Sequence, residues 1–336
     1  MKVAVIGSGG WGTALALVLT ENGHQVSVWC RRADKCEEMC RTRENPQLKG
    51  VALPEALELT TDMSIVEECP VVILATPSFA VRDTVRRLCP RLKPGTVLVL
   101  VSKGIEKGTS LLLSQVVEEE VGTHFPVVVL SGPSHAEEVG RKIPTAVVVA
   151  SEHREAAELA QDIFMNERFR IYTSPDIIGV EIAAAMKNVI ALCAGCIDGM
   201  GLGDNTKAML VTRGLTEIAR LGVAMGARKE TFAGLAGVGD LIVTCTSIHS
   251  RNNRAGRAIG QGAPVEQAVS GMDGSVVEGY YAAASARELA EKTGVEMPIT
   301  TGAYAVLYEY ADPMTVLTQL MSREKRGELE AEQSWL

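Results

Sequence analysis

Apolar and polar residues alternate along the first half of the chain in a pattern typical of buried strands separated by amphipathic helices. Short β-branched runs, which predict strands, lie at residues 2–6, 25–30, 57–60, 71–75, 97–101, 127–130 and 146–150. Segments with helical spacing of apolar residues, at 78–88, 110–119 and 154–164, separate most of them. Strands that alternate with helices predict an α/β fold with a parallel, doubly wound sheet.

The apolar spacing changes near Tyr172-Thr173-Ser174-Pro175-Asp176, after which the chain is nearly all helical. Long helices are predicted at 178–197, 205–225, 280–292 and 302–310. We therefore expect a doubly wound domain over residues 1–174 and an all-α C-terminal domain over residues 175–336. Ligands of an open α/β sheet bind beyond the carboxyl ends of its strands. The helical domain should close over that edge and make the active site a cleft between the domains.

The first strand runs directly into Gly7-Ser8-Gly9-Gly10-Trp11-Gly12, a G-x-G-x-x-G motif that opens a helix. In this motif Gly7 permits a tight turn, Gly9 lets the backbone approach a pyrophosphate, and Gly12 lets the helix pack on the strand. Free N–H groups at the helix N-terminus would then face the phosphates. The context predicts a Rossmann-type dinucleotide-binding domain, and the alternative is an ordinary glycine-rich βα turn.

The end of the second strand indicates which dinucleotide is bound. An NAD enzyme usually places an Asp or Glu there, on the ribose hydroxyls, but this chain has Arg31 and Arg32. Guanidinium groups can pair with a 2′-phosphate, so we expect NADPH to be accepted. Asp34 could still hold a ribose hydroxyl and permit NADH. A solvated loop is the alternative for the two arginines.

Composition narrows the classes of partner. The 336 residues include 33 Lys and Arg against 41 Asp and Glu, a net charge of −8, which argues against nucleic acid or an anionic membrane surface. The apolar stretch at 178–197 is interrupted by Glu181 and Lys187, so we expect no stable membrane insertion. The N-terminus enters a predicted strand at once, without a targeting peptide, and a cytoplasmic location is expected.

Cysteine and histidine usage gives no sign of a disulfide framework or a metal. The eight cysteines lack the paired spacing of zinc ribbons or secreted proteins, so we expect reduced thiols. Cys193 and Cys196 form a C-x-x-C, but within an apolar helical run, which argues against a redox role. The five histidines show no metal-ligand spacing, and no metal is expected.

Two predicted strands are followed by polar residues at the ligand-binding edge. Lys103 follows the strand at 97–101, where a nicotinamide would lie, although a solvent-facing lysine has the same spacing. Ser134 and Glu137 fit a capping box, which is a sufficient structural explanation for both. The functional alternative is that this helix start and the Ser134 hydroxyl bind polar oxygens of substrate or nicotinamide. His135 is a poor general base, since a helix N-terminus disfavours the imidazolium.

Lys187 and Asn188 interrupt the apolar helix at 178–197. An ammonium buried without a partner is costly, and desolvation lowers the pKa of a lysine toward neutrality, as proton transfer requires. The alternative is a lysine whose charge reaches solvent along the helix surface. Asp240, on a glycine-rich turn, is a suitable counter-charge for Lys187.

Ser250, Arg251 and Asn252 lead into a further predicted helix. A hydroxyl, a guanidinium and an amide at a helix N-terminus can together bind a phosphate. A turn and a helix cap would explain the same residues.

Six segments occur in the order found in the NAD(P)-dependent glycerol-3-phosphate dehydrogenases: GSGGWGTALA, VSKGIE, SGPSHAEEVG, EIAAAMKNVIAL, GLAGVGDLIVTCTS and HSRNNR. The chain resembles this family, specifically its bacterial biosynthetic type, over nearly its whole length. The resemblance implies reversible NAD(P)H-dependent reduction of dihydroxyacetone phosphate to sn-glycerol 3-phosphate for glycerophospholipid synthesis. It also implies a cytoplasmic enzyme that is commonly a homodimer.

The resemblance implies roles for individual residues. Lys187 is similar to the family's general acid/base, with Lys103 and Asp240 beside it as catalytic and substrate-binding residues. The further residues similar to substrate and phosphate contacts are Gly132, Ser134, Asn188, Ser250, Arg251 and Asn252. Ala136, Val276 and Glu278 resemble cofactor contacts, and the rest of the predicted cofactor site is Gly7, Gly9, Gly10, Trp11, Gly12, Arg31, Arg32, Lys103 and Arg251. Gly10 departs from the family, where Ser or Ala often precedes the aromatic residue, which puts one side-chain contact near the pyrophosphate in doubt.

The chemistry of the reaction agrees with these roles. A protonated Lys187 can supply the proton that the forming alkoxide needs, while Lys103 stabilises negative charge. Arg251 can anchor the substrate phosphate and so orient the carbonyl carbon. Two alternatives remain: a dehydrogenase of phosphorylated hydroxyacids related to 6-phosphogluconate dehydrogenase, and a non-enzymatic NADPH-sensing regulator. The first would not carry SGPSHAEE together with GVGDLIVTCTS, and the second should lack a cation and carboxylate set in the cleft.

Overall fold

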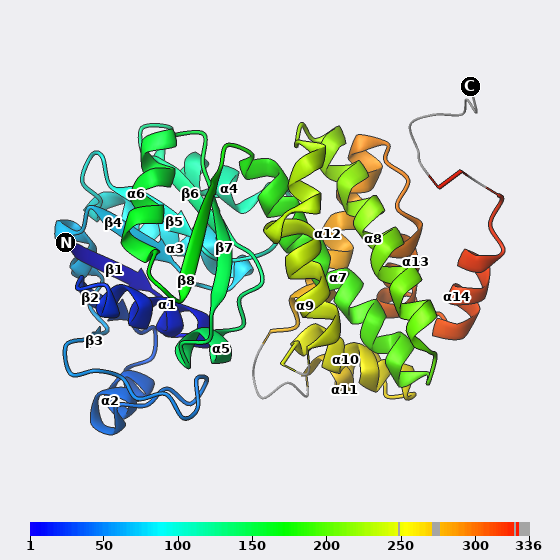
Figure 1. Ribbon diagram of the computed structural model, residues 1–336, viewed down its shortest axis with the longest axis horizontal. Helices are drawn as coiled ribbons and strands as arrows, with labels where there is room; N and C mark the ends of the chain where they lie inside the picture. Colours follow the sequence, from blue (N-terminus) through cyan, green and yellow to red (C-terminus); the bar gives the residue numbers. More distant parts are fainter. Residues whose placement is uncertain (248, 271–275, 326, 329–336) are drawn as a thin grey trace.

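The N-terminal part of the computed structural model is an eight-stranded sheet with the strand order β3-β2-β1-β4-β5-β6-β7-β8 (Figure 1). The structure describes residues 1–247, 249–270, 276–325 and 327–328. The strands are β1 Lys2–Ile6, β2 Gln25–Trp29, β3 Glu58–Thr60, β4 Val71–Leu74, β5 Val97–Leu100, β6 Val127–Ser131, β7 Thr145–Ala150 and β8 Phe169–Ser174.

Strands β1 to β6 are parallel, and their register aligns the ends that carry the predicted site. In β1, Val3 lies opposite Val26 of β2 and Val71 of β4. Runs of Val, Ile and Leu buried on both faces, as in β4 and β5, are typical of a parallel sheet covered by helices. The carboxyl ends of β1, β2, β4, β5 and β6 therefore meet at one edge, which faces the helical domain (Figure 1).

Helices cover both faces of the sheet and form the whole second domain. The N-terminal helices are α1 Gly10–Glu21, α2 Ala33–Thr42, α3 Val81–Leu88, α4 Leu113–Val121, α5 Ala136–Gly140 and α6 Arg154–Phe164. The C-terminal helices are α7 Ile177–Gly199, α8 Asp204–Ala224, α9 Asp240–Thr246, α10 Arg251–Gly260, α11 Val265–Ser270, α12 Glu278–Thr293, α13 Pro298–Tyr308 and α14 Pro313–Met321. Short 3₁₀ segments are η1 Met63–Glu68, η2 Ser78–Ala80, η3 Cys89–Arg91 and η4 Lys229–Ala233, and η5 Leu235–Gly239 is a π-helical turn.

The predicted fold class is confirmed, but the last two strands differ from the prediction. β7 pairs with β6 in the antiparallel sense, and β8, which the sequence analysis missed, pairs with β7 in parallel. The connection from β6 to β7 contains only α5, five residues long, which is too short to cover the sheet as a crossover helix. β8 alternates buried and exposed residues at the edge of the sheet, so it lacks the continuous apolar run of a central strand.

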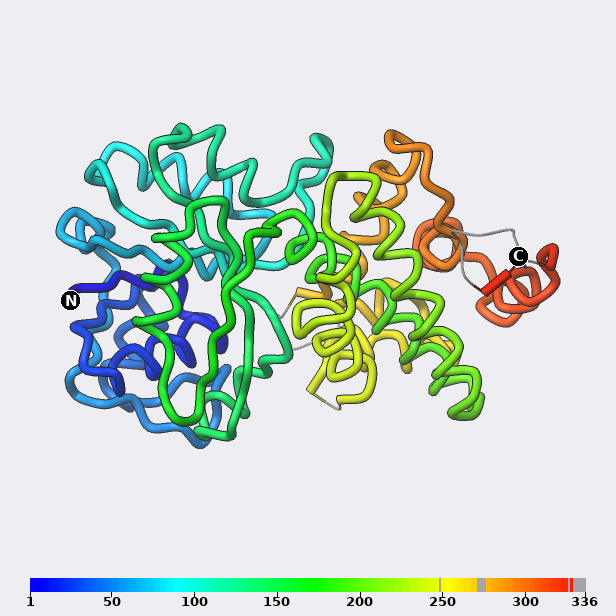
Figure 2. The backbone as a smooth tube through the Cα atoms, turned by 45° about the horizontal axis from the view of Figure 1, so that its top comes forward, coloured from blue at the N-terminus to red at the C-terminus, as the bar shows by residue number. Residues whose placement is uncertain are grey.

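Helix α7 is the core of the helical domain and packs against α8, α9, α10 and α12 (Figure 2). It is long and apolar enough to span a membrane, but 89% of its apolar window is buried inside the protein. Glycines bring α10 very close to it: a Cβ on Gly195 would lie 2.0 Å from the Asn253 carbonyl oxygen, and one on Gly256 would lie 1.9 Å from that of Leu192. This crossing fixes the N-terminus of α10 relative to α7.

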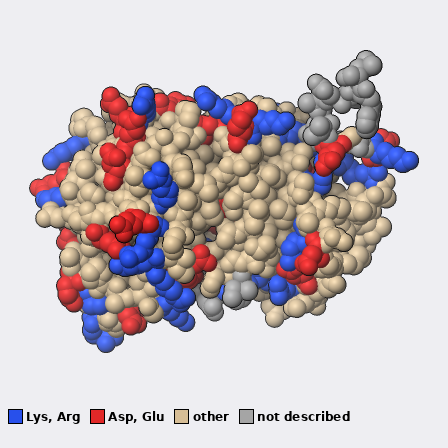
Figure 3. Space-filling model, viewed as in Figure 1, with Lys and Arg blue, Asp and Glu red and all other residues tan. Residues whose placement is uncertain are grey.

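Charged side chains are mixed over the face shown in Figure 3, where Lys and Arg lie among Asp and Glu on both domains. One network joins α3 to α4, with Arg82 paired to Glu106, Glu119 and Glu120 at 2.7–2.8 Å.

Candidate active site

The glycine turn between β1 and α1 is tightly packed at Gly7 and Gly12 and has free space at Gly9. Gly7 has a φ of 128°, and a Cβ there would lie 2.4 Å from the Ala75 carbonyl oxygen, so glycine is required. A Cβ on Gly12 would lie 2.3 Å from the Gly7 carbonyl oxygen. At Gly9, by contrast, the nearest atom is Gln47 Oε1 at 3.8 Å. This open side next to the N-terminus of α1 fits the pyrophosphate of a dinucleotide.

The structure explains why residue 10 is a glycine, which the sequence analysis did not predict. A Cβ on it would lie 2.8 Å from the Gln47 carbonyl oxygen, so the backbone after α2 fills the space that a side chain would need. The same Cβ would lie 3.7 Å from that of Ala136, which puts the start of α5 beside the glycine turn. The indole Nε1 of Trp11 is buried without a hydrogen-bond partner in the described part of the chain.

Arg31 and Arg32 follow β2 and are exposed. Arg32 Nε lies 3.4 Å from Asp34 Oδ1, so the carboxylate considered for a ribose hydroxyl is paired with a guanidinium instead. Two cations at this strand end suit a 2′-phosphate better than the single carboxylate typical of NAD enzymes.

Lys103 extends from the loop after β5 to the helical domain. Its ammonium lies 2.8 Å from Asp240 Oδ2 and 3.3 Å from the Gly132 carbonyl oxygen. Asp240 is the first residue of α9 and follows the η5 turn, where a Cβ on Gly237 would lie 2.1 Å from the Phe232 carbonyl oxygen. The glycine-rich segment thus turns tightly enough to hold the buried Asp240 carboxylate against a lysine of the other domain.

Lys187 lies on α7 at the same carboxylate. Its ammonium forms an ion pair with Asp240 Oδ1 and donates to Thr244 Oγ1 at 2.9 Å. Thr244 lies one turn after Asp240 on α9 and donates to the Asp240 backbone carbonyl at 2.6 Å. The predicted pairing of Lys187 with Asp240 is observed, and the alternative, a lysine that reaches solvent, is wrong because its side chain is only 8% exposed.

The electrostatics of this cluster favour a lysine that titrates near neutrality. Burial lowers the pKa of Lys187 to about 7; the charge of Asp240 opposes the shift, and that of Lys103 adds to it. Burial opposes ionisation of Asp240, but the ammonium groups of Lys103 and Lys187 outweigh it and lower the pKa of that carboxyl. The pair is therefore a fixed carboxylate beside an ammonium that can release its proton.

Ser250 and Arg251 form the start of α10, as predicted. The Ser250 hydroxyl caps the helix by accepting from the Asn253 N–H at 3.2 Å. The Arg251 side chain is exposed, with no hydrogen bond or ion pair to other described residues. It is close enough to Glu278 for its charge to act on that partly buried carboxyl, which accepts from Ser78 Oγ at 2.7 Å across the domains. Val276, two residues before Glu278, is partly buried and precedes the Val277 N-cap of α12.

Asn188 and Asn252 are bonded to each other. Asn252 Nδ2 donates to Asn188 Oδ1 at 2.9 Å, and Asn252 Oδ1 accepts from the Gly279 N–H at 2.8 Å. These two bonds tie α7, α10 and α12 together directly beside Lys187. The residues predicted to contact the substrate phosphate therefore have a structural role as well.

The capping box predicted at Ser134 is wrong. His135 is the N-cap of α5, and Ser134 Oγ donates instead to the Gly132 carbonyl oxygen at 3.0 Å. His135 is itself still extended before the helix begins at Ala136, so the Ser134 hydroxyl lies one residue too early to cap the helix. Burial and the charge of Lys187 lower the pKa of His135, which keeps its imidazole neutral. Gly132, with a φ of 145°, approaches Val147 so closely that a Cβ would lie 3.0 Å from its Cα.

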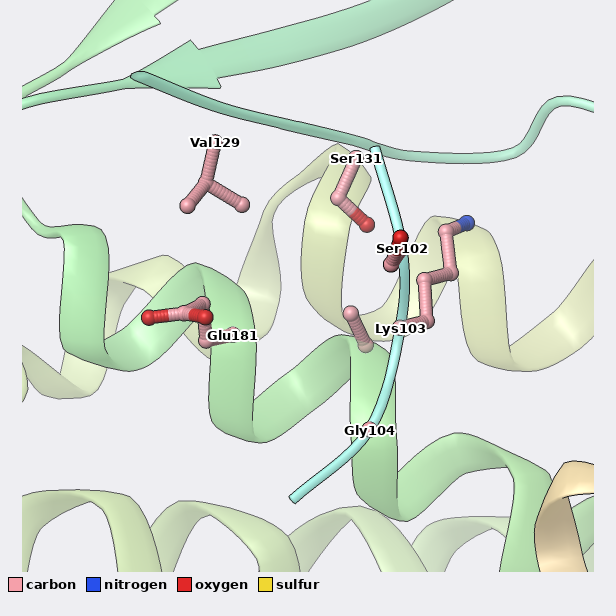
Figure 4. A pocket seen from close by; sticks show the side chains of 7 residues that line it. Ser102, Lys103, Gly104, Val129, Ser131 and Glu181 are labelled. Atoms are coloured by element: carbon pink, nitrogen blue, oxygen red, sulfur yellow. The ribbon is translucent and has the colours of Figure 1, made fainter. Parts of the chain in front are cut away.

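A narrow crevice runs from Lys103 along α7 (Figure 4). It is lined by Ser102, Lys103, Gly104, Val129, Ser131, Glu181 and Ala184. Glu181 bonds the Ser114 N–H at 3.0 Å, and burial raises its pKa to about 7. The crevice has no room for a water molecule, so the substrate is expected on the ammonium side of Lys103.

Sequence reasoning missed Thr244 and Ser78. The signal for Thr244 was its position four residues after Asp240 on a helix, where side chains share a face. No local signal pairs Ser78 with Glu278, because 200 residues separate them.

All eight cysteines are free thiols. Burial raises the pKa of both Cys193 and Cys196, which disfavours the thiolate that redox chemistry needs. Among residues 1–247, 249–270, 276–325 and 327–328, no group of three or more His, Cys, Asp and Glu side chains is arranged to hold a metal.

The doubly wound sheet with a glycine turn, closed by a helical domain that brings a lysine and an aspartate to its carboxyl edge, defines a nicotinamide-dinucleotide dehydrogenase. The family model for the N-terminus of NAD-dependent glycerol-3-phosphate dehydrogenase matches residues 2–157, and the model for its C-terminus matches residues 176–318. The chain belongs to the NAD-dependent glycerol-3-phosphate dehydrogenase family.

Curated relatives and solved structures agree with this assignment. The chain is 52% identical over 330 residues to glycerol-3-phosphate dehydrogenase (NAD(P)+) of Desulfitobacterium hafniense (strain Y51), covering 98% of this chain and 93% of the relative. The enzyme of the same name from Moorella thermoacetica is 51% identical, with 98% of each chain covered. The crystal structure of glycerol-3-phosphate dehydrogenase from Coxiella burnetii has a TM-score of 0.92 at 38% identity, over 96% of this chain and 99% of that one. A ketopantoate reductase from Ralstonia eutropha JMP134, 14% identical with a TM-score of 0.61, shares the fold alone.

Proposed function

We propose that this chain catalyses the reversible reduction of dihydroxyacetone phosphate to sn-glycerol 3-phosphate with NADPH, and also accepts NADH. The observation that supports this proposal most directly is the cluster of Lys187, Asp240 and Lys103 at the carboxyl edge of a dinucleotide-binding sheet, in a member of this family. The product supplies glycerophospholipid synthesis.

The proposed cofactor fits the glycine turn, since Gly9 leaves open the side that a pyrophosphate needs and α1 points its N-terminus there. The residues proposed to hold the cofactor are Gly7, Gly9, Gly10, Trp11, Gly12, Arg31, Arg32, Lys103, Ala136, Arg251, Val276 and Glu278. When bound, the reduced nicotinamide supplies a hydride to the substrate carbonyl carbon.

Lys187 supplies the proton in the proposed reduction. Its ammonium already donates to Asp240 and Thr244, which leaves its third proton for the carbonyl oxygen of the substrate. That oxygen becomes the hydroxyl of the product as the proton transfers, and Lys187 is left neutral. Lys103 contributes a second positive charge beside the developing alkoxide. Asp240 holds both ammonium groups and compensates their charge.

Arg251 is proposed to hold the substrate phosphate together with the N-terminus of α10. Its guanidinium has no partner among the described residues, while the charge of Asp240 is already shared by two lysines. Ser250, Asn252 and Asn188, the last two hydrogen-bonded to each other, are proposed to contribute to this site from the helical domain, and Gly132 and Ser134 from the other domain. A phosphate anchored there would hold the carbonyl carbon in place for hydride transfer.

The activity should depend on pH in opposite ways for the two directions. Reduction needs protonated Lys187, whose pKa is about 7, so kcat/KM for dihydroxyacetone phosphate should fall as the pH rises through that value. Oxidation of glycerol 3-phosphate needs the neutral amine, so its kcat/KM should rise over the same range. Initial rates in both directions across this range test the expectation. If kcat/KM changes with pH in the same direction for reduction and for oxidation, Lys187 is not the group that transfers the proton.

The two alternative functions are not favoured. Dehydrogenases related to 6-phosphogluconate dehydrogenase share the general architecture, but the family models cover both halves of this chain as a glycerol-3-phosphate dehydrogenase. A regulator that only senses NADPH has no need of a lysine with a pKa of about 7 held on a buried carboxylate.

We also propose that the chain is a cytoplasmic homodimer, as the family resemblance implies. The apolar residues exposed at the C-terminal end support a second copy there: Tyr310, Met314 and Met321 are 68%, 44% and 63% exposed, and no residue of α14 is fully buried. A molar mass of one chain in dilute solution would contradict the dimer.

A further inference from the structure

Lys35 places an ammonium directly on the glycine turn. It lies in the first turn of α2, and its Nζ is 2.7 Å from the Ser8 carbonyl oxygen and 3.3 Å from Gln47 Oε1. Its side chain is half-buried there, unlike the exposed side chains of Arg31 and Arg32. Burial lowers the pKa of Lys35, and the nearby charge of Arg32 lowers it further.

Among the described residues no carboxylate is paired with this ammonium, although the charge of Glu38 acts on it. Within the described parts of the chain Lys35 has no ion pair, and the nearby Asp34 is paired with Arg32. The Ser8 carbonyl does not need the lysine, because the buried Asn45 Nδ2 also donates to it at 3.2 Å. A partly desolvated cation whose bonds are not needed to satisfy the backbone is free to bind an anion that a ligand brings.

The backbone after α2 holds this arrangement in place. Asn45 is fully buried and donates to Thr13 Oγ1 at 2.7 Å, which fixes the segment on the first turn of α1. Gln47 then lies against Gly10 and within reach of the Lys35 ammonium. The Lys35 ammonium is therefore held in a defined position between the end of β2 and the glycine turn.

The position of the ammonium indicates which anion it meets. In this class of fold the pyrophosphate faces the N-terminus of the first helix, and the adenosine ribose lies between the glycine turn and the end of the second strand. Lys35 bridges these two elements, from the start of α2 to Ser8. A phosphate on the ribose 2′-oxygen would therefore lie near the Lys35 ammonium, on which the charge of Arg32 also acts.

We propose that Lys35 is a specificity-determining residue that binds the 2′-phosphate of NADPH, together with the two arginines that precede it. This inference rests on the proposed use of NADPH. The ammonium moves from the Ser8 carbonyl to the phosphate when the cofactor binds, and Asn45 keeps that carbonyl satisfied. With NADH, which lacks the phosphate, Lys35 stays on Ser8 and contributes little.

Equilibrium binding of NADPH and NADH to the full-length Lys35→Gln variant tests the proposal without turnover. A charged hydrogen bond contributes roughly 1.5–3 kcal/mol, so the Kd for NADPH should rise about ten- to a hundredfold. The Kd for NADH should stay within about twofold of that of the unmodified protein, since the lost bond was made only to the 2′-phosphate. Lys35→Arg keeps the charge and should retain most of the preference for NADPH.

Lys93→Gln is the matched control, because it removes one exposed positive charge just before β5, at the amino ends of the parallel strands and away from the glycine turn. It should change neither Kd. Equal losses of affinity for NADPH and NADH in Lys35→Gln would mean that the ammonium serves the pyrophosphate or the fold, and would overturn the proposal. Unchanged NADPH binding would overturn it as well. The binding result does not depend on dehydrogenase activity. If the protein has no activity but Lys35→Gln still weakens NADPH binding and not NADH binding, only the proposed reaction is contradicted.

Discussion

Replacement of Lys187 by Ala should lower kcat for dihydroxyacetone phosphate reduction by about 10²–10⁴-fold, the range that positioned proton transfer contributes. The affinity for NADPH should stay close to that of the unmodified enzyme, because Lys187 lies on α7 and not at the glycine turn. Steady-state rates and fluorescence titration with NADPH measure the two quantities.

Two further observations separate proton transfer from a structural role of Lys187. Lys187→Arg preserves a positive charge beside Asp240, but a guanidinium does not release its proton near neutral pH, so kcat of this variant should fall by a similar factor. A small primary amine added to Lys187→Ala should restore part of the activity by entering the vacated space. Turnover of folded Lys187→Ala within about threefold of the unmodified enzyme would show that another group donates the proton.

Replacement of Arg251 by Ala should reduce kcat/KM for dihydroxyacetone phosphate by at least about 2 kcal/mol, or roughly 30-fold, the cost of breaking a charged hydrogen-bonded pair. The much weaker activity on unphosphorylated dihydroxyacetone should scarcely change, since that substrate never uses the anchor. Steady-state kinetics with both substrates give the comparison.

Arg257→Ala is the matched control for the phosphate anchor. It removes a guanidinium from the same helix, but from a residue that pairs with Asp198 at the far end of α7. This variant should keep nearly full activity on dihydroxyacetone phosphate. If Arg251→Ala slows both substrates by the same factor, Arg251 acts through the cofactor or the fold, and the phosphate lies elsewhere.

The sequence predicted those parts of the site that local patterns control. The glycine turn follows from six consecutive residues. Lys187 was identified because it is a charged residue inside an apolar helix. The expected ion pair with Asp240 is observed because a buried ammonium requires a counter-charge and the helical domain offers Asp240 on a tight turn. The catalytic and binding roles of these residues stay predictions.

The parts that were missed depend on contacts distant in sequence or on small shifts in local structure. Ser78 contributes through a contact that only the folded chain defines, and Thr244 was missed although it lies four residues after Asp240 on a helix. A one-residue shift in the start of α5 made the capping box at Ser134 wrong. The sequence analysis did not single out Lys35, because the segment that holds it on the glycine turn follows α2. The direction of β7 depended on the short length of α5.

The most direct test of the central claim is a spectrophotometric assay of the purified protein with dihydroxyacetone phosphate and each reduced cofactor. We predict that NADPH is oxidised in proportion to added dihydroxyacetone phosphate, that sn-glycerol 3-phosphate is the product, and that NADH supports the same reaction. Absence of oxidation with either cofactor, while 6-phosphogluconate or another phosphorylated hydroxyacid supports reduction of NADP+, would contradict the account.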